Sequence, residues 1–224
     1  MALQKDPWNI IITGVGGQGN VLASQILGQM LVQQGYIITI GETYGASQRG
    51  GSVMSHIRVS RRGQFSPLIP EGKCDLVIGL EPVEALRVLA NYGNPGVMML
   101  INTRPIYPID VIAGSAAYPE LSVVLKKIQR LSRGVWTLNA TEIGLELGDP
   151  IFSNIVMLGA LSALDLLPLH REGFQNAIQE MLPSHKLHLN MNAFDRGREA
   201  VRNFFPDLTL MVNSASRIRS LKRP

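Results

Sequence analysis

Apolar positions along the first hundred residues alternate between the spacing typical of strands and the spacing typical of helices. Short apolar or alternating runs predict strands over residues 10–13, 36–40, 53–60, 75–80 and 97–101. Between residues 17 and 34 the apolar positions recur at helical spacing, and Pro82 is placed to begin a second helix that ends near residue 91. This alternation is typical of an α/β protein with parallel strands.

The second half of the chain is mainly helical in pattern. After a proline-interrupted stretch between residues 102 and 119, helices are predicted over 121–131, 151–166, 171–182 and 187–203, with one short strand over 135–138. No flexible linker rich in glycine and serine separates these helices from the earlier strands. We therefore expect three layers, a mostly parallel sheet and C-terminal helices packed on it, all within residues 1–204, followed by a basic tail over residues 205–224.

A glycine-rich loop joins the first predicted strand to the first predicted helix. It reads Gly14-Val15-Gly16-Gly17-Gln18-Gly19. Glycines allow positive φ and close approach of a ligand, and the N-terminus of the following helix suits a phosphate or a carboxylate. The spacing matches the dinucleotide fingerprint of Rossmann-like folds, and Glu42 lies about as far along the chain as a ribose-binding acid would.

We therefore expect a Rossmann-like α/β fold, but the residues leave two interpretations of the loop open. One is an NAD or FAD site. The other is close packing of the helix on the strand, or against another subunit. Gln18 offers an amide that can form hydrogen bonds with a ligand or with a neighbouring chain.

A second glycine-rich segment follows the second predicted strand. It reads Tyr44-Gly45-Ala46-Ser47-Gln48-Arg49-Gly50-Gly51. The planar fork of Arg49 suits phosphate or carboxylate, and Gly50 and Gly51 allow a large group to approach. Because a loop of this kind is costly to order, we expect a partner or a ligand to order it. The alternative is a solvent loop in which Arg49 pairs with Glu42.

Composition restricts the class of protein. With 224 residues, 46% hydrophobic and 17% charged, the chain is typical of a globular domain. No run reaches the roughly 18–20 apolar residues of a membrane helix, and no apolar signal region opens the sequence, so we expect a cytoplasmic protein. The single cysteine, Cys74, excludes a disulfide framework and an iron–sulfur cluster held by this chain alone.

Charge and histidine spacing point to neither nucleic acid nor a metal. The net charge is +4, and basic residues crowd the tail without the aromatic interleaving of a nucleic-acid-binding segment. His185 and His188 are three residues apart, but no cysteine or carboxylate joins them at the spacing of a metal site. No pair of residues indicates acid–base catalysis, and no catalytic residue is assigned.

Together these segments resemble one family, the gamma-type subunits or domains of 2-oxoacid:ferredoxin oxidoreductases, and most closely the beta subunit of the indolepyruvate type. The resemblance covers about residues 9–200. Its motifs are Gly14-Val15-Gly16-Gly17-Gln18-Gly19, Tyr44 with Arg49-Gly50-Gly51, His56-Ile57-Arg58-Val59-Ser60, Ser66-Pro67-Leu68-Ile69, Glu81-Pro82 after a strand, Asn154 with Met157-Leu158-Gly159, and Asn190 with Ala193-Phe194 and Gly197.

The resemblance implies a function that depends on a partner. Such enzymes decarboxylate a 2-oxoacid on thiamine diphosphate, pass electrons through [4Fe–4S] clusters to ferredoxin, and transfer the acyl group to coenzyme A. In the indolepyruvate type, a large alpha subunit carries the thiamine and cluster sites. For the present chain, the resemblance implies that residues 1–204 form a pyruvate/ketoisovalerate oxidoreductase gamma-type catalytic domain, which holds no cofactor on its own.

The same resemblance implies that both glycine segments lie near the partner or the path of coenzyme A. The residues named for such a site are Gly14, Gly16, Gly17, Gln18, Gly19, Tyr44, Arg49, Gly50 and Gly51. Two alternatives remain: a self-contained NAD(P)- or FAD-dependent oxidoreductase that uses Gly14–Gly19 with Glu42, and a binding or regulatory module without catalysis. A chain shaped to meet a large partner is also expected to expose an apolar patch, which is compatible with a homodimer in isolation.

Overall fold

The computed structural model describes residue 3, residues 5–45 and residues 51–204. Six strands form a single sheet: β1 (Trp8–Val15), β2 (Ile37–Tyr44), β3 (Ser52–Ser60), β4 (Leu76–Gly79), β5 (Met98–Asn102) and β6 (Gly134–Leu138). Their order across the sheet is β2-β3-β1-β4-β5-β6. β1, β4, β5 and β6 pair in parallel, whereas β3 is antiparallel to both of its neighbours, β1 and β2. The predicted mostly parallel sheet is confirmed, with β3 as its one reversed strand.

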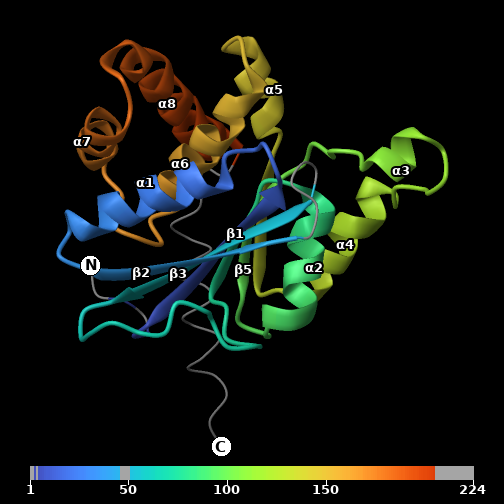
Figure 1. Ribbon diagram of the computed structural model, residues 1–224, viewed down its shortest axis with the longest axis horizontal. Coiled ribbons are helices and arrows are strands. Elements are labelled where there is room, and N and C mark those ends of the chain that lie inside the picture. The colour runs from blue at the N-terminus through green and yellow to red at the C-terminus, as the bar shows by residue number, and fades with distance from the viewer. Residues whose placement is uncertain (1–2, 4, 46–50, 205–224) are drawn as a thin grey trace, which may run out of the picture.

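Helices cover both faces of the sheet. They are α1 (Asn20–Val32), α2 (Pro82–Tyr92), α3 (Ile109–Ile112), α4 (Leu121–Leu131), α5 (Ala140–Glu146), α6 (Ser153–Ala163), α7 (Arg171–Met181) and α8 (Leu187–Phe204), with short 3-10 turns at Pro150–Phe152 and Ser184–Lys186. Figure 1 shows α1, α6, α7 and α8 together on one side, and α2 and α4 on the other. This is the expected three-layer α/β architecture, and it explains why the central strands β4 and β5 are mainly apolar and buried on both faces.

The central strand shows how the sheet feeds two hydrophobic cores. Ile10 and Ile12 point into the larger core, which the C-terminal helices and α1 close. Ile11, on the opposite face, belongs to a smaller core under α2 and α4. Because side chains alternate across a strand, one apolar run supplies both cores.

The C-terminal helices α6 and α8 pack with their backbones in close contact. A Cβ added at Gly159 of α6 would overlap the carbonyl group of Phe194, and one added at Gly197 of α8 would overlap that of Val156. Both glycines are therefore required by the approach of the two helices. Ten of the eleven residues of α6, Ser153 to Ser162, are buried, so this helix lies inside the helical layer.

Several predicted boundaries were wrong. β2 runs to Tyr44 rather than to residue 40, because the antiparallel pairing with β3 continues to Tyr44 opposite Val53. The first helix begins at Asn20 rather than at residue 17, because Gly17 and Gly19 have positive φ. The predicted helix over 151–166 opens with a 3-10 turn, and its α-helical part is Ser153–Ala163.

The short helices α3 and α5 were not predicted from the sequence. None of the helices among residues 3, 5–45 and 51–204 combines the length and the apolar character of a bilayer-spanning segment.

Candidate functional site

The glycine-rich loop turns at the carboxyl end of the central strand β1. Gly17 and Gly19 have φ angles of +101° and +76°, a region that glycine enters without the steric cost of a Cβ. Gly19 is the N-cap residue of α1, and none of the described side chains caps the free N–H groups of its first turn. The loop thus presents the N-terminus of α1, with its partial positive charge, at the edge of the sheet.

Gln18 folds back and fastens this loop to the sheet. The backbone N–H of Val15 donates to Gln18 Oε1 at 2.8 Å, and Gln18 Nε2 donates to the carbonyl oxygen of Leu80 at 2.8 Å. A Cβ at Gly14 would overlap Gln18 Oε1, so glycine leaves room for Gln18 in this position. Both polar atoms of this amide therefore form bonds within the chain, and the predicted bond to a ligand or a neighbouring chain stays a prediction.

The last glycine of the loop is also explained by packing. Asn154, at the start of α6, donates from Nδ2 to the carbonyl oxygen of Gly19 at 3.3 Å. A Cβ at Gly19 would overlap that same amide nitrogen. Internal contacts therefore account for the glycines at both ends of the loop, whereas a Cβ at Gly17 would meet nothing within 4 Å.

The structure brings the two glycine-rich segments together at one point. The backbone N–H of Gly16 donates to the carbonyl oxygen of Gly51 at 2.9 Å. Tyr44 is exposed at the end of β2, and its hydroxyl donates to Glu42, a bond that raises the pKa of Tyr44. Arg49 and Gly50 lie outside the described residues.

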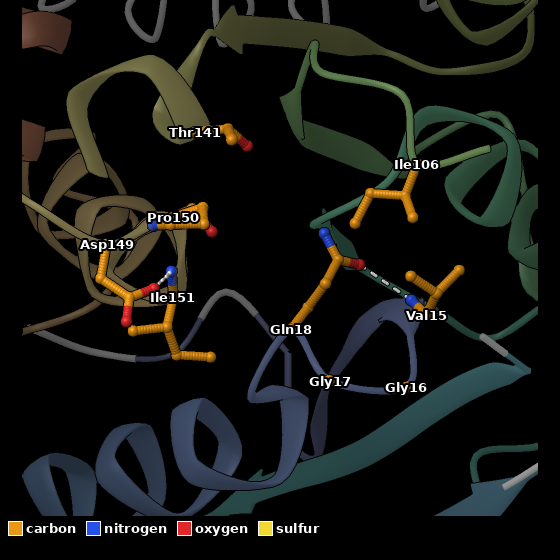
Figure 2. Close-up of a pocket in the computed structure, with 10 residues that line it drawn as sticks. Val15, Gly16, Gly17, Gln18, Ile106, Thr141, Asp149, Pro150 and Ile151 are labelled. Carbon is orange, nitrogen blue, oxygen red and sulfur yellow. Dashed lines mark hydrogen bonds between the residues drawn. The ribbon is translucent and has the colours of Figure 1, made fainter. Parts of the chain in front are cut away.

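A cavity of about 550 Å³ opens beside the loop. Figure 2 shows the loop and Ile106 on one side of it, with Thr141 and the turn at Asp149 on the other. Gly16 and Gly17 line it with backbone, and Asp149 contributes a carboxylate whose Oδ1 is already bonded by the N–H of Ile151 at 2.8 Å. The cavity lies where parallel α/β sheets bind ligands, at the carboxyl ends of the strands.

Glu42 does not sit where a ribose-binding acid would. β3 lies between β1 and β2, so the strand that carries Glu42 is two positions from β1, or roughly 9–10 Å at the usual strand spacing. Its carboxylate accepts hydrogen bonds from the hydroxyls of Ser24 and Tyr44. This arrangement argues against the self-contained NAD(P) interpretation, although the loop has the spacing of the fingerprint.

A second cavity, of about 370 Å³, adjoins the first and shares Val15 and Ile106 with it. Its chemistry was not predicted from the sequence. Glu81, at the N-cap of α2, accepts hydrogen bonds from the backbone N–H of Glu84 at 2.8 Å and from the hydroxyl of Tyr118. Burial raises the pKa of Glu81. Burial and the hydrogen bond to Glu81 both raise the pKa of Tyr118.

We call this second cavity, which Glu81, Glu84 and Asp110 line, the acidic cavity. Only part of it could be predicted from the sequence. Pro82 is a typical first residue of a helix, so the sequence places Glu81 directly before a helix. Tyr118 is 37 residues away along the chain, and nothing local links it to Glu81.

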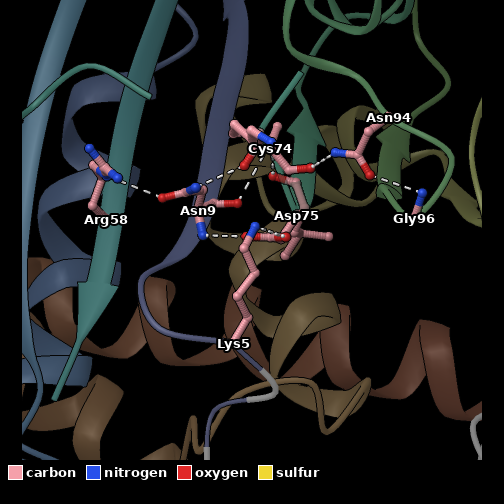
Figure 3. A network of polar contacts seen from close by, with 9 residues as sticks. Lys5, Asn9, Arg58, Cys74, Asp75, Asn94 and Gly96 are labelled. Carbon is pink, nitrogen blue, oxygen red and sulfur yellow. Dashed lines mark hydrogen bonds and ion pairs between the residues drawn. The ribbon is translucent and has the colours of Figure 1, made fainter. Parts of the chain in front are cut away.

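A network of hydrogen bonds joins neighbouring segments at the opposite end of the sheet. Figure 3 shows Asn9 as the centre of this network. Its side chain accepts from Arg58 at 3.2 Å and donates to the carbonyl oxygen of Lys73 at 2.8 Å, while its N–H donates to Asp75 at 2.9 Å. Cys74 is fully buried beside it, and burial raises the pKa of its thiol. We assign this cluster a structural role.

Comparison with known proteins agrees with the resemblance in the motifs. A family model described as pyruvate ferredoxin/flavodoxin oxidoreductase matches residues 9–200. The indolepyruvate oxidoreductase subunit IorB of Pyrococcus horikoshii is 37% identical over 196 residues, which are 87% of this chain and 96% of that protein. The subunit of the same name from Archaeoglobus fulgidus is 38% identical over 189 residues, which are 84% and 92% of the two chains.

A solved structure supports the fold. The gamma subunit of the keto/oxoacid ferredoxin oxidoreductase from Geobacter sulfurreducens superposes with a TM-score of 0.61 at 23% identity. The superposition covers 87% of this chain and 98% of that one.

Proposed function

The chain belongs to the pyruvate ferredoxin/flavodoxin oxidoreductase family, and from this premise we propose that it is the small, gamma-type subunit of an indolepyruvate:ferredoxin oxidoreductase. The enzyme would cleave CO₂ from an aryl pyruvate, transfer the acyl group to the sulfur of coenzyme A, and pass the released electrons to ferredoxin. The observation that carries this proposal is the nearly full-length match to subunits named for indolepyruvate, at 37% and 38% identity.

We assign the thiamine diphosphate and the iron–sulfur clusters to a large partner subunit. A [4Fe–4S] cluster takes four thiolates, and this chain has one cysteine, Cys74, which is buried with a raised pKa. Within residues 3, 5–45 and 51–204, no three His, Cys, Asp or Glu side chains come together as a ligand set. Bound thiamine diphosphate would supply the decarboxylation chemistry, and the clusters would supply the electron path.

Coenzyme A is the group toward which this chain offers fitting residues. Its phosphates suit the N-terminus of α1, which no described side chain caps, and the backbone of Gly16 and Gly17, which line the cavity beside the loop. We include Arg49 because its guanidinium group can bind a phosphate and because it follows the carboxyl end of β2 along the chain. Gly14, Gln18 and Gly19 shape the loop, and residues 1–204 form the domain that carries it.

Arg49→Ala tests the coenzyme A part of this proposal. In the assembled enzyme, we expect the Michaelis constant for coenzyme A to rise while the Michaelis constant for the 2-oxoacid stays the same, because one charge-assisted contact to phosphate is lost. The control is Arg130→Ala, which removes an exposed arginine from the last turn of α4. An unchanged Michaelis constant for coenzyme A in Arg49→Ala would contradict the assignment.

A substrate panel tests the choice of 2-oxoacid. The enzyme reconstituted with its large subunit is offered indolepyruvate, phenylpyruvate, pyruvate, 2-oxoisovalerate and 2-oxoglutarate, and ferredoxin reduction is followed by absorbance. We expect the highest kcat/KM for the aryl pyruvates. A preference for 2-oxoglutarate or pyruvate would refute the indolepyruvate assignment and leave the subunit assignment standing.

A further inference from the structure

One residue that lines the acidic cavity, Glu84, has a buried carboxylate oxygen without a partner among the described residues. Glu84 lines the cavity and is 6% exposed. Its Oε1 pairs with Arg87 at 3.0 Å, but its Oε2 has no hydrogen-bond partner among the described residues. A buried charged acceptor without a partner is costly, so a donor that arrives from outside the described structure would be strongly favoured.

The rest of the cavity is also suited to a cation. Glu81 is buried one turn before Glu84, and Asp110 lines the same cavity. Arg87 is the one basic residue among the described residues that line it, and its side chain is 67% exposed. These walls therefore carry three carboxyl groups against one guanidinium that is largely in solvent. The charge balance favours a positively charged occupant.

The rim of the cavity indicates that this cation belongs to a protein. One wall is the segment that includes α3, which Figure 1 shows extending from the body of the domain. Ile109 and Ile112 of α3 are 79% and 72% exposed, and Tyr107 next to them is also exposed. A free small cation would leave these apolar side chains in water, whereas a protein surface would cover them.

We propose that the acidic cavity is a socket that receives an arginine or lysine side chain of the large partner subunit, with Glu84 as its principal acceptor. The inference rests on the proposed function, which requires that partner. It places the partner contact next to the glycine loop, because the two cavities share the walls formed by Val15 and Ile106. A neutral or acidic partner side chain would leave Glu84 Oε2 unsatisfied.

The test compares assembly with stability in three variants of the full chain. The dissociation constant for the large subunit is measured by biolayer interferometry, and the unfolding temperature of each isolated chain by calorimetry. Glu84→Gln should weaken assembly about tenfold or more, because it removes one charge of a buried pair. The isolated variant should melt within about 2 °C of the natural chain, or above it, since the charge it removes is not fully paired there.

Two further variants separate docking from a structural role. Arg87→Met removes the internal competitor for Glu84, so assembly should stay the same or become tighter. Glu172→Gln makes the same chemical change at an exposed site on α7, on the other side of the sheet, and should leave assembly within about twofold.

Assembly of Glu84→Gln as tight as that of the natural chain overturns the socket. So does a loss of assembly in Arg87→Met equal to that in Glu84→Gln, because it would make the internal pair the structural unit. If the natural chain itself does not bind the large subunit, the proposed function fails and the socket fails with it. The first two results leave the proposed function intact.

Discussion

Replacing Gln18 with glutamate alters the clamp that positions the glycine loop, at nearly constant size. In the natural chain, Gln18 accepts from the N–H of Val15 and donates to the carbonyl oxygen of Leu80, both at 2.8 Å. Glutamate keeps the first bond. In place of the second it puts a carboxylate oxygen against a carbonyl oxygen inside the protein.

The sign of the effect follows from the protonation state of the introduced carboxyl group. When it is protonated, this group can donate to the carbonyl oxygen of Leu80, whereas its ionised form cannot. Folding therefore raises its pKa above the unfolded value of about 4.3. A raised pKa gives stability that is present below the unfolded pKa and is lost as the pH rises through the folded pKa. A rise of about 2 pKa units would cost roughly 2.7 kcal/mol at pH 8.

Urea unfolding at pH 5 and pH 8 measures this cost. The fluorescence of the buried Trp8 and Trp136 reports unfolding, and the natural chain at each pH corrects for every other titration. Because pH 5 already lies above the unfolded pKa, about 1 kcal/mol of this cost is present there, and we expect Gln18→Glu to lose about 1.7 kcal/mol more at pH 8 than at pH 5. The comparator Gln18→Ala should lose roughly 2 kcal/mol at both, about 1 kcal/mol for each hydrogen bond. An equal loss for glutamate at both pH values would refute the clamp.

Three further outcomes follow from the packing. Gly159→Ala should lower the free energy of unfolding by about 2 kcal/mol or more, because its Cβ overlaps the backbone of Phe194; Gly134→Ala, whose Cβ meets nothing within 4 Å, is the control, and equal losses would contradict the account. Cys74 should react with a thiol reagent at pH 8 only in denaturant, since it is buried with a raised pKa; complete labelling of the native chain within minutes would disprove this. Burial lowers the pKa of His56, so the stability that its neutral form contributes should be present above about pH 6.5 and lost on acidification. His56→Asn should therefore lose less free energy of unfolding between pH 8 and pH 5 than the natural chain does, and an equal loss in the two proteins would contradict this.

The strand–loop–helix unit at the start of the chain could be predicted because its signals are local. An apolar run, closely spaced glycines and helical periodicity follow one another within residues 10–34. The position of β3 between β1 and β2 could not be predicted, because its alternation shows that it is a strand but not which strands it pairs with. That one insertion separates Glu42 from the loop and removes the basis for a ribose site.

The candidate site divides in the same way. The glycine loop could be predicted from the sequence. Which of its glycines pack and which line the cavity could not, because Gly19 packs against Asn154, 135 residues away in the chain. The acidic cavity depends on the meeting of Glu81 with Tyr118 across 37 residues. By contrast, α5 had a usable local signal. Asn139 is the N-cap of this helix, and its Oδ1 accepts from the backbone N–H of Glu142 at 3.1 Å, in the asparagine-to-glutamate spacing of a capping box.

The central claim is that this chain is one part of an enzyme, and reconstitution tests it most directly. Increasing amounts of the purified chain are added to a fixed amount of its large subunit, with indolepyruvate, coenzyme A and ferredoxin, and the rate of ferredoxin reduction is recorded. We predict no rate with this chain alone, little with the large subunit alone, and a rise to a plateau as the chain is added. A full rate from the large subunit alone, or NAD reduction by this chain alone, would contradict the claim.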